Sequence, residues 1–323
     1  MKIRYSIAFS LFALAAANPT VYAAESPYPD RPIRLIVPFA PGGGTDIVAR
    51  PIAQYLTESF GKPVIVDNRA GGGGSIGHEA LVRSAPDGYT MMVTSTSYAS
   101  NAALFMQKYD PIKDVAAINM FCESGFMVMV HPSVPVRTTP QLIALAKSKP
   151  GALNYASTGT GGVTHLATEL FNLTAGTVMT HVPYKGTGAA LSDLLSGQVQ
   201  LIVGGMANMV NMHKAGRLRG IAVTTEKRVS AVPDVPTVSE QFPGFIAILW
   251  FGAVGPGKVP ASIINRWSVD INKALAQPVM QERLAAEGYV TVGGSPEKFA
   301  AVISRDIAQW TRVVREAKVK VEQ

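Results

Sequence analysis

The sequence predicts an α/β protein with two domains, and three observations support this prediction. The chain has 323 residues, about twice the length of a typical domain. Short runs rich in β-branched residues alternate with segments in which apolar residues recur every three or four positions. Hydrophobic residues make up 47% of the chain and charged residues only 16%, a balance that excludes intrinsic disorder. The alternation predicts mostly parallel sheets flanked by helices.

Nine runs are predicted to be strands: residues 33–37, 64–66, 90–94, 127–130, 153–156, 178–182, 199–203, 218–223 and 248–254. Between most of them, apolar residues recur at helical spacing. The clearest helical rows are Ile263, Trp267, Ile271 and Leu275, and Phe299, Ile303, Ile307, Trp310 and Val314.

The first 23 residues have the pattern of a secretory signal peptide. Lys2 and Arg4 precede an apolar stretch over residues 7–17, and small residues follow at the expected cleavage point after Ala23. The apolar stretch is too short to span a membrane, and no longer one follows it. We therefore expect an exported protein; a retained N-terminal anchor is the alternative.

Charge and cysteine content exclude several classes of function. The net charge is +7, but Lys and Arg are scattered, which argues against nucleic-acid binding and suits a small anionic ligand. Cys122 is the only cysteine, so neither an internal disulfide nor a thiolate metal cluster is expected. The five histidines lack the close spacing of metal ligands, so we expect no metal site.

Pro- and Gly-rich connections at residues 131–140 and 255–257 are the places where the chain is expected to leave one domain and return to it. The predicted division is a first domain of residues 24–125 and 248–323, and a second of residues 126–247.

Two glycine-rich loops, at residues 38–46 and 157–165, each connect a predicted strand to a predicted helix. The first turn of a helix carries unpaired N–H groups and a partial positive charge, so such a loop favours an anion. In open α/β sheets, ligands bind beyond the carboxyl ends of strands, where these loops lie. Two such loops facing each other across a cleft would each hold one carboxylate of a dicarboxylate. The alternative is that they are ordinary turns, with Thr45, Asp46 and Thr164 as helix N-caps.

Two further strand ends supply candidate ligand contacts. Gly204 follows the strand at 199–203, and Met206 next to it would line an apolar wall, unless it simply packs in the core. Ser95, Thr96 and Ser97 follow the strand at 90–94 and offer hydroxyl groups.

Two formal motif matches carry little weight. Residues 73–77 fit G-x-S-x-G around Ser75, but the run of four glycines makes chance matches common, and residues 68–70 separate it from its strand. Gly72, Gly74 and Gly77 fit G-x-G-x-x-G without following a first strand tightly, so no dinucleotide cofactor is expected. A Ser75-centred carboxylester hydrolase nevertheless stands as the enzymatic alternative.

Several stretches, in order from residue 28 to the C-terminus, resemble the extracytoplasmic solute receptors of the tripartite tricarboxylate transporters, the Bug family. They are residues 28–33, 38–46, 66–69, 86–90, 157–166, 181–186 and 233–237. The resemblance implies a type II periplasmic-binding-protein-like fold with a ligand cleft, a periplasmic location and no catalysis. It also implies delivery of a carboxylate to a permease with one large and one small subunit. We expect a monomer; a ligand-sensing receptor for signalling is a further alternative.

In this family the two glycine-rich loops hold ligand carboxylates through backbone amides and water. The strand matching 199–203 commonly ends there in an aromatic–acidic pair, whereas this chain has Val203, Gly204 and Gly205. We therefore expect a dicarboxylate without an amine, for example an aromatic one such as terephthalate, although Asp46 could pair with an amine. No catalytic residue, metal or cofactor is expected. The candidate ligand-binding residues are Phe39, Ala40, Gly43, Gly44, Thr45, Asp46, Ser95, Thr96, Ser97, Ser157, Thr158, Gly159, Thr160, Gly161, Gly162, Thr164, His165, Tyr184, Gly204 and Met206.

Overall fold

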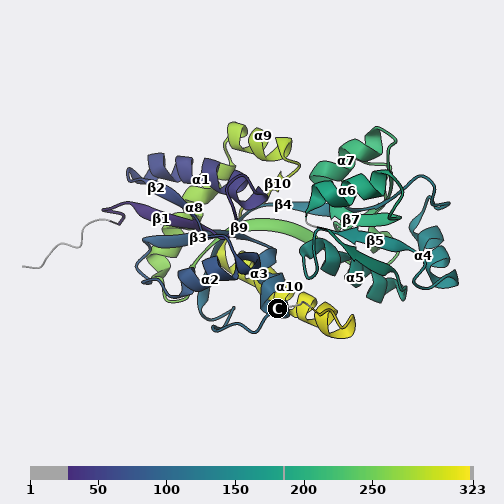
Figure 1. Ribbon diagram of the computed structural model, residues 1–323. Helices are drawn as coiled ribbons and strands as arrows, with labels where there is room; N and C mark the ends of the chain where they lie inside the picture. Colours follow the sequence, from purple (N-terminus) through teal and green to yellow (C-terminus); the bar gives the residue numbers. More distant parts are fainter. Residues whose placement is uncertain (1–27, 185, 321–323) are drawn as a thin grey trace, which may run out of the picture.

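The computed structural model describes residues 28–184 and 186–320, so the predicted signal peptide lies outside the described residues. The described chain forms an α/β protein with two lobes (Figure 1). Two long strands join the lobes: β4 (Val115–Val130) and β9 (Ile248–Pro256), which pair antiparallel. The predicted α/β class is confirmed. The predicted boundary at 125/126 falls within β4 and the one at 247/248 directly precedes β9, and the division into domains stays a prediction.

The first lobe is built on a sheet in the order β2-β1-β3-β9-β4. Its strands β1 (Ile33–Val37), β2 (Val64–Asn68) and β3 (Thr90–Ser95) are parallel, whereas β9 runs antiparallel to β3, and the short β10 (Val290–Thr291) runs antiparallel to β4. The helices of this lobe are α1 (Gly44–Phe60), α2 (Ser75–Val82), α3 (Ser97–Leu104), α8 (Ala261–Leu275), α9 (Pro278–Ala286) and α10 (Pro296–Glu316), with a 3-10 turn η1 (Gly72–Gly74).

The second lobe continues the sheet through the other half of β4. Strands β5 (Asn154–Ser157), β6 (Thr180–Pro183) and β7 (Leu201–Gly205) are parallel to one another. Both β7 and β8 (Arg219–Val223) pair antiparallel with β4 after residue 125. The helices are α4 (Thr139–Ser148), α5 (Val163–Ala175), α6 (Thr187–Leu195) and α7 (Met206–Lys214), and a 3-10 turn η2 (Val238–Glu240) follows β8.

Strand β4 is much longer than the predicted strand at residues 127–130. The additional residues include Glu123, Ser124 and Gly125, which break the β-branched pattern that the prediction relies on. They are extended because β9 pairs with them along its whole length. Tertiary pairing therefore sets this strand where local composition does not.

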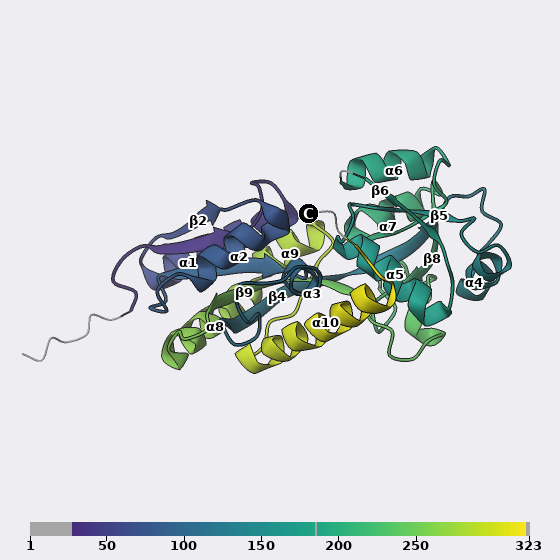
Figure 2. The same cartoon turned by 60° about the horizontal axis from the view of Figure 1, so that its bottom comes forward.

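Helix α10 crosses from the first lobe to the second, as Figure 2 shows along the lower face of the molecule. It packs against α3 in the first lobe and against α5 in the second. Trp310 and Val313 in its last turns belong to the same buried cluster as Phe171 and Phe245 of the second lobe. One apolar core therefore extends across both lobes. Among the described residues, no helix combines the length and hydropathy needed to cross a membrane.

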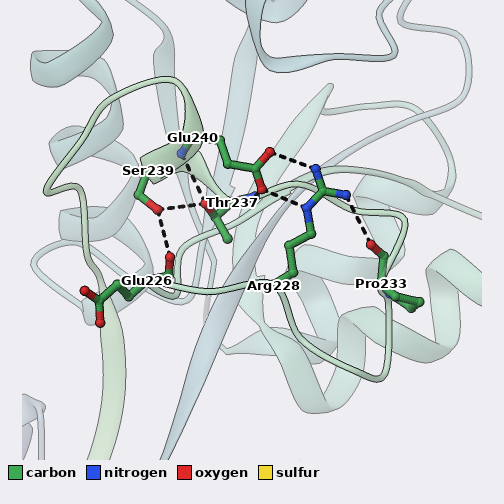
Figure 3. Close-up of polar contacts among 6 residues, drawn as sticks. All are labelled: Glu226, Arg228, Pro233, Thr237, Ser239 and Glu240. Atoms are coloured by element: carbon green, nitrogen blue, oxygen red, sulfur yellow. Dashed lines mark hydrogen bonds and ion pairs between the residues drawn. The ribbon is translucent and has the colours of Figure 1, made fainter.

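The irregular segment between β8 and β9 is fixed by a polar network (Figure 3). The Arg228 guanidinium donates to both carboxylate oxygens of Glu240, at 2.8 and 2.7 Å, and to the carbonyl of Pro233 at 3.2 Å. Thr237 and Glu240 form a reciprocal capping box at the start of η2. This network holds the chain on both sides of residues 229–231 in a defined path.

Candidate ligand site

The first glycine-rich loop ends at the N-terminus of α1. The N-cap residue is Gly43, so no N-cap side chain accepts a hydrogen bond from the first turn. Thr45 and Asp46 lie inside that turn rather than at the cap. Within the described part of the chain, the N–H groups of Gly44, Thr45 and Asp46 donate to no acceptor. Gly42 has a φ of 79°, which favours glycine and turns the chain into the helix. The loop therefore presents three unpaired donors at the positive end of a helix.

The carboxylate of Asp46 holds this loop in shape. It accepts hydrogen bonds from the Gly42 N–H at 2.9 Å, from Asn68 Nδ2 at 3.0 Å and from Arg50 at 2.8 and 2.9 Å. Although burial acts to raise its pKa, these donors together hold the pKa of Asp46 below its ordinary value. The side chain is 3% exposed. Its hydrogen-bonding capacity is thus occupied by the protein itself.

The second glycine-rich loop has the same form. Gly162 is the N-cap of α5 and makes no side-chain cap, so Thr164 again lies inside the first turn. Its hydroxyl instead bonds Thr158, accepting from the backbone N–H and meeting the Thr158 hydroxyl, both at 3.0 Å. Among the hydrogen bonds of the described residues, none uses the N–H groups of Val163, Thr164 or His165 as donors. A second set of open helix donors results.

A stacked group of aromatic rings packs against this second loop. His165 and His181 stack with ring centroids 3.8 Å apart, and Tyr155 stacks on His181. His165 Nδ1 accepts from the Gly161 N–H at 3.0 Å, and His181 Nε2 bonds the Ser157 hydroxyl at 2.6 Å. Burial, with His181 adding to it, lowers the pKa of His165 to about 4. Both rings are therefore neutral near pH 7, and they shape the loop rather than supply charge.

A cavity of about 240 Å³ lies between the lobes next to this loop. Thr158, Thr164 and Met206, all predicted ligand contacts, line it. Gly44 of the first loop stands at its margin: a Cβ placed there would lie 3.4 Å from the hydroxyl of Tyr289, which also lines the cavity. No charged side chain is among the lining residues, which are Ser124, Phe126, Thr158, Val163, Thr164, Thr187, Gly205, Met206, Ala207, Leu249 and Tyr289.

Four of these residues come from segments that sequence reasoning did not associate with a site. Ser124 and Phe126 lie on β4 just before the predicted strand at 127–130, and Leu249 lies on β9 within the predicted strand at 248–254. Tyr289 follows the turn after α9 and stacks edge-on against Phe251, with centroids 5.1 Å apart. Burial raises the pKa of Tyr289 to about 12, so its hydroxyl keeps its proton near neutral pH. The only local signal in the sequence for this position is the preceding glycine, Gly288.

Other predicted site residues are engaged elsewhere. Thr96 is fully buried, and its hydroxyl accepts from the Trp250 N–H at 2.8 Å and donates to the Ile248 carbonyl, which ties β3 to β9. The Ser95 and Ser97 hydroxyls bond each other at 2.9 Å. Tyr184 donates to Asp193 at 2.8 Å. These residues do not line the cavity, and their role in ligand contact stays a prediction.

Positions 39 and 204 are also accounted for by packing. A Cβ at Gly204 would lie 3.0 Å from Met209, so this glycine admits the Met209 side chain. The ring of Phe39 lies against Gly74 of the rejected glycine motif. In that motif, His78 bonds Thr94 at 2.9 Å rather than Ser75. Across the described residues, no cluster of His, Cys, Asp and Glu could hold a metal ion.

Known proteins resemble the chain over most of its length. A family model described as the tripartite tricarboxylate transporter family receptor matches residues 48–319. Protein BugT of Bordetella pertussis is 36% identical over 313 residues, 96% of either chain. A protein encoded in the tcbD-tcbE intergenic region of Pseudomonas sp. strain P51 is 34% identical, covering 92% of this chain and 89% of its own length.

Solved structures resemble the whole described fold. Rpa4515 of R. palustris with adipate superposes with a TM-score of 0.76 at 31% identity, covering 91% of this chain and 99% of that one. MatC of Rhodopseudomonas palustris with bound malate gives 0.73 at 30% identity, covering 89% and 100%. The chain therefore belongs to the tripartite tricarboxylate transporter, or Bug, family of periplasmic solute-binding receptors, which bind solutes and are not enzymes.

Proposed function

We propose that this receptor captures a small dicarboxylate between its two glycine-rich loops. The observation that carries the proposal is the pair of helix N-termini, each with three N–H groups that no acceptor in the described chain occupies. Each charge-assisted hydrogen bond contributes about 1.5–3 kcal/mol. Six of them, less the ordering cost of association, suffice for the roughly 8 kcal/mol of micromolar binding.

The cavity chemistry favours an anion held by backbone dipoles rather than by ion pairs. Arg50, the cation nearest the first loop, is already bonded to Asp46, and the histidines under the second loop are neutral near pH 7. Because Asp46 is saturated by its own neighbours, it is poorly suited to pair with a ligand amine. Both points support a ligand without an ammonium group at this end of the cleft. Phe126, Leu249 and Met206 add apolar walls that suit a carbon chain or an aromatic ring, as in terephthalate.

We further propose that the protein is exported by cleavage near Ala23, acts as a monomer, and delivers its ligand to a membrane permease with one large and one small subunit. The family supports the transport role, and the relatives solved with adipate and malate support the ligand class. The lobes would close on the ligand around β4 and β9, which are their shared strands.

Isothermal titration of the purified mature protein with succinate, adipate and terephthalate tests this proposal. We expect at least one to bind, and Gly161→Val to abolish that binding, because Gly161 has a φ of 77° and is buried in the second loop. Gly216→Val is the matched control: its φ is 66°, and no atom lies within 4 Å of the added Cβ. Equal loss of affinity in both variants, or no binding of any dicarboxylate by the wild type, would refute the proposal.

A further inference from the structure

A second cavity, of about 400 Å³, adjoins the candidate ligand site. The two cavities share four lining residues: Ser124, Met206, Ala207 and Tyr289. We call the second one the side chamber. It is lined by these four residues together with Glu123, Gly125, Val210, Asn211, Thr225, Val229, Ser230, Ala231, Ala285, Ala286, Gly288 and Val290. Most of these are apolar or small, in contrast to the hydroxyl-rich wall of the second loop.

Met206 stands between the two spaces. Its side chain is 5% exposed, and its sulfur would lie 3.2 Å from a Cβ at Gly125, so the glycine in β4 leaves room for the thioether. A methionine in this place can change rotamer without losing a hydrogen bond. The neighbouring wall is a direct contact between lobes, because a Cβ at Gly288 would lie 2.8 Å from Cα of Ala207. The side chamber is therefore a lateral extension of the cleft, and the Met206 side chain lies between the two spaces.

The outer wall of the side chamber is held in place by the Arg228–Glu240 network, which is separate from the two glycine-rich loops. Val229, Ser230 and Ala231 follow directly after Arg228, whose two hydrogen bonds to Glu240 fix this part of the chain (Figure 3). A bidentate guanidinium–carboxylate pair gives a defined geometry even at the surface. The wall of the chamber formed by residues 229–231 therefore has a fixed position.

Glu123 gives the side chamber a selective chemistry. Among the hydrogen bonds of the described residues, none involves its carboxyl group, which lies half-buried in the chamber wall on β4. Burial raises its pKa, and Arg305 acts in the opposite direction. A second carboxylate entering here would meet a like charge, whereas a hydroxyl could donate a hydrogen bond to Glu123.

We propose that the side chamber receives an uncharged apolar substituent of the bound carboxylate, either aryl or branched alkyl. A hydroxyl at the end of this substituent donates a hydrogen bond to the Glu123 carboxylate. This inference rests on the proposed function, since the carboxylates must be held by the glycine-rich loops. It makes Glu123 and Met206 the residues that determine which carboxylic acids fit. The preferred ligand is then a dicarboxylate that carries a bulky side group, with unbranched dicarboxylates binding more weakly.

Isothermal titration with three matched acids tests the proposal: succinate, 2-phenylsuccinate and 2-(4-hydroxyphenyl)succinate. The wild type is expected to bind phenylsuccinate at least about tenfold more tightly than succinate, a difference of ~1.4 kcal/mol. The hydroxyphenyl acid should bind several-fold more tightly again. Val210→Trp fills the chamber from α7 and should remove the phenyl advantage while leaving succinate affinity unchanged. Lys214→Trp, at the exposed end of the same helix, should change neither.

Glu123→Gln separates the hydroxyl contact from simple packing. This variant should retain the phenyl advantage and tolerate a carboxylate in place of the hydroxyl, using 2-(4-carboxyphenyl)succinate as the probe. If succinate binds but phenylsuccinate binds no better, or if Val210→Trp weakens both acids equally, the side-chamber proposal is wrong while the proposed function stands. If no acid of the series binds, and terephthalate and adipate also fail, the proposed function itself is wrong.

Discussion

Replacing Asp46 by Ala should both destabilise the protein and weaken ligand binding, although we place this side chain outside direct ligand contact. The substitution removes four hydrogen bonds to a carboxylate side chain that is 3% exposed. The bonds from Gly42 and Asn68 contribute about 1 kcal/mol each. The Arg50 pair adds only about 0.5–1 kcal/mol, because the arginine side chain is half-exposed and screened by water. The expected total is roughly 2–3 kcal/mol.

Thermal unfolding measures this loss directly. For a chain of this size it corresponds to a fall in Tm of roughly 3–5 °C. Asp67→Ala is the control, because Asp67 pairs with Arg69 on the surface and its loss should cost less than about 1 kcal/mol. Affinity for the dicarboxylate should fall at least about tenfold in Asp46→Ala, because the loop donors lose their fixed positions, and should be unchanged in Asp67→Ala.

Acid should erase the stability difference between wild type and Asp46→Ala. The folded-state pKa of Asp46 lies below its ordinary value of 3.8, so its stabilisation is complete above that pH and is lost as the pH falls through the folded pKa. The difference in Tm should therefore be constant from pH 5 to 8 and should shrink below about pH 4. If Asp46→Ala behaves like Asp67→Ala in Tm and in affinity, the carboxylate does not hold the loop.

Two further substitutions test the packing of the sheet and the neutral histidine. Gly252→Ala should cost about 1–3 kcal/mol by urea unfolding, because the added Cβ would lie 2.4 Å from Phe299. The same change at Gly188, where nothing lies within 4 Å, should be neutral or stabilising, and equal effects at both sites would contradict the packing argument. Because burial lowers the pKa of His165 to about 4, the unfolded chain takes up a proton first, and stability should decline as the pH falls from about 6.5 to 4. His165→Gln should flatten this decline, whereas His131→Gln, outside the site, should not; an unchanged slope in His165→Gln would show that this ring is not buried and neutral.

Local patterns were sufficient to predict the parallel part of each lobe. The strands before both glycine-rich loops, and the helices after them, occur where β-branched runs and helical spacing place them. The amphipathic rows of α8 and α10 also predict which faces are buried, with Trp267 and Trp310 both in the core. These elements are predictable because the period of the apolar residues reflects the face that each buries.

The long strands that join the lobes, and their contribution to the site, could not be predicted in this way. Residues 115–125 are extended because β9 pairs with them, and that partner lies more than one hundred residues away in the sequence. Ser124 and Tyr289 enter the cavity through this long-range arrangement and carry no local motif. The alternative in which Thr45, Asp46 and Thr164 cap their helices is wrong, because Gly43 and Gly162 are the N-cap residues, in an extended conformation.

The helix that spans both lobes has a consequence for how the protein is made. Trp310 and Val313 complete an apolar cluster that also contains Ile36, a residue synthesised more than two hundred positions earlier. The buried cluster that joins the two lobes is therefore complete only after the C-terminal helix has been synthesised. A C-terminal truncation before α10 would therefore expose apolar residues of both lobes, in addition to removing the helix itself.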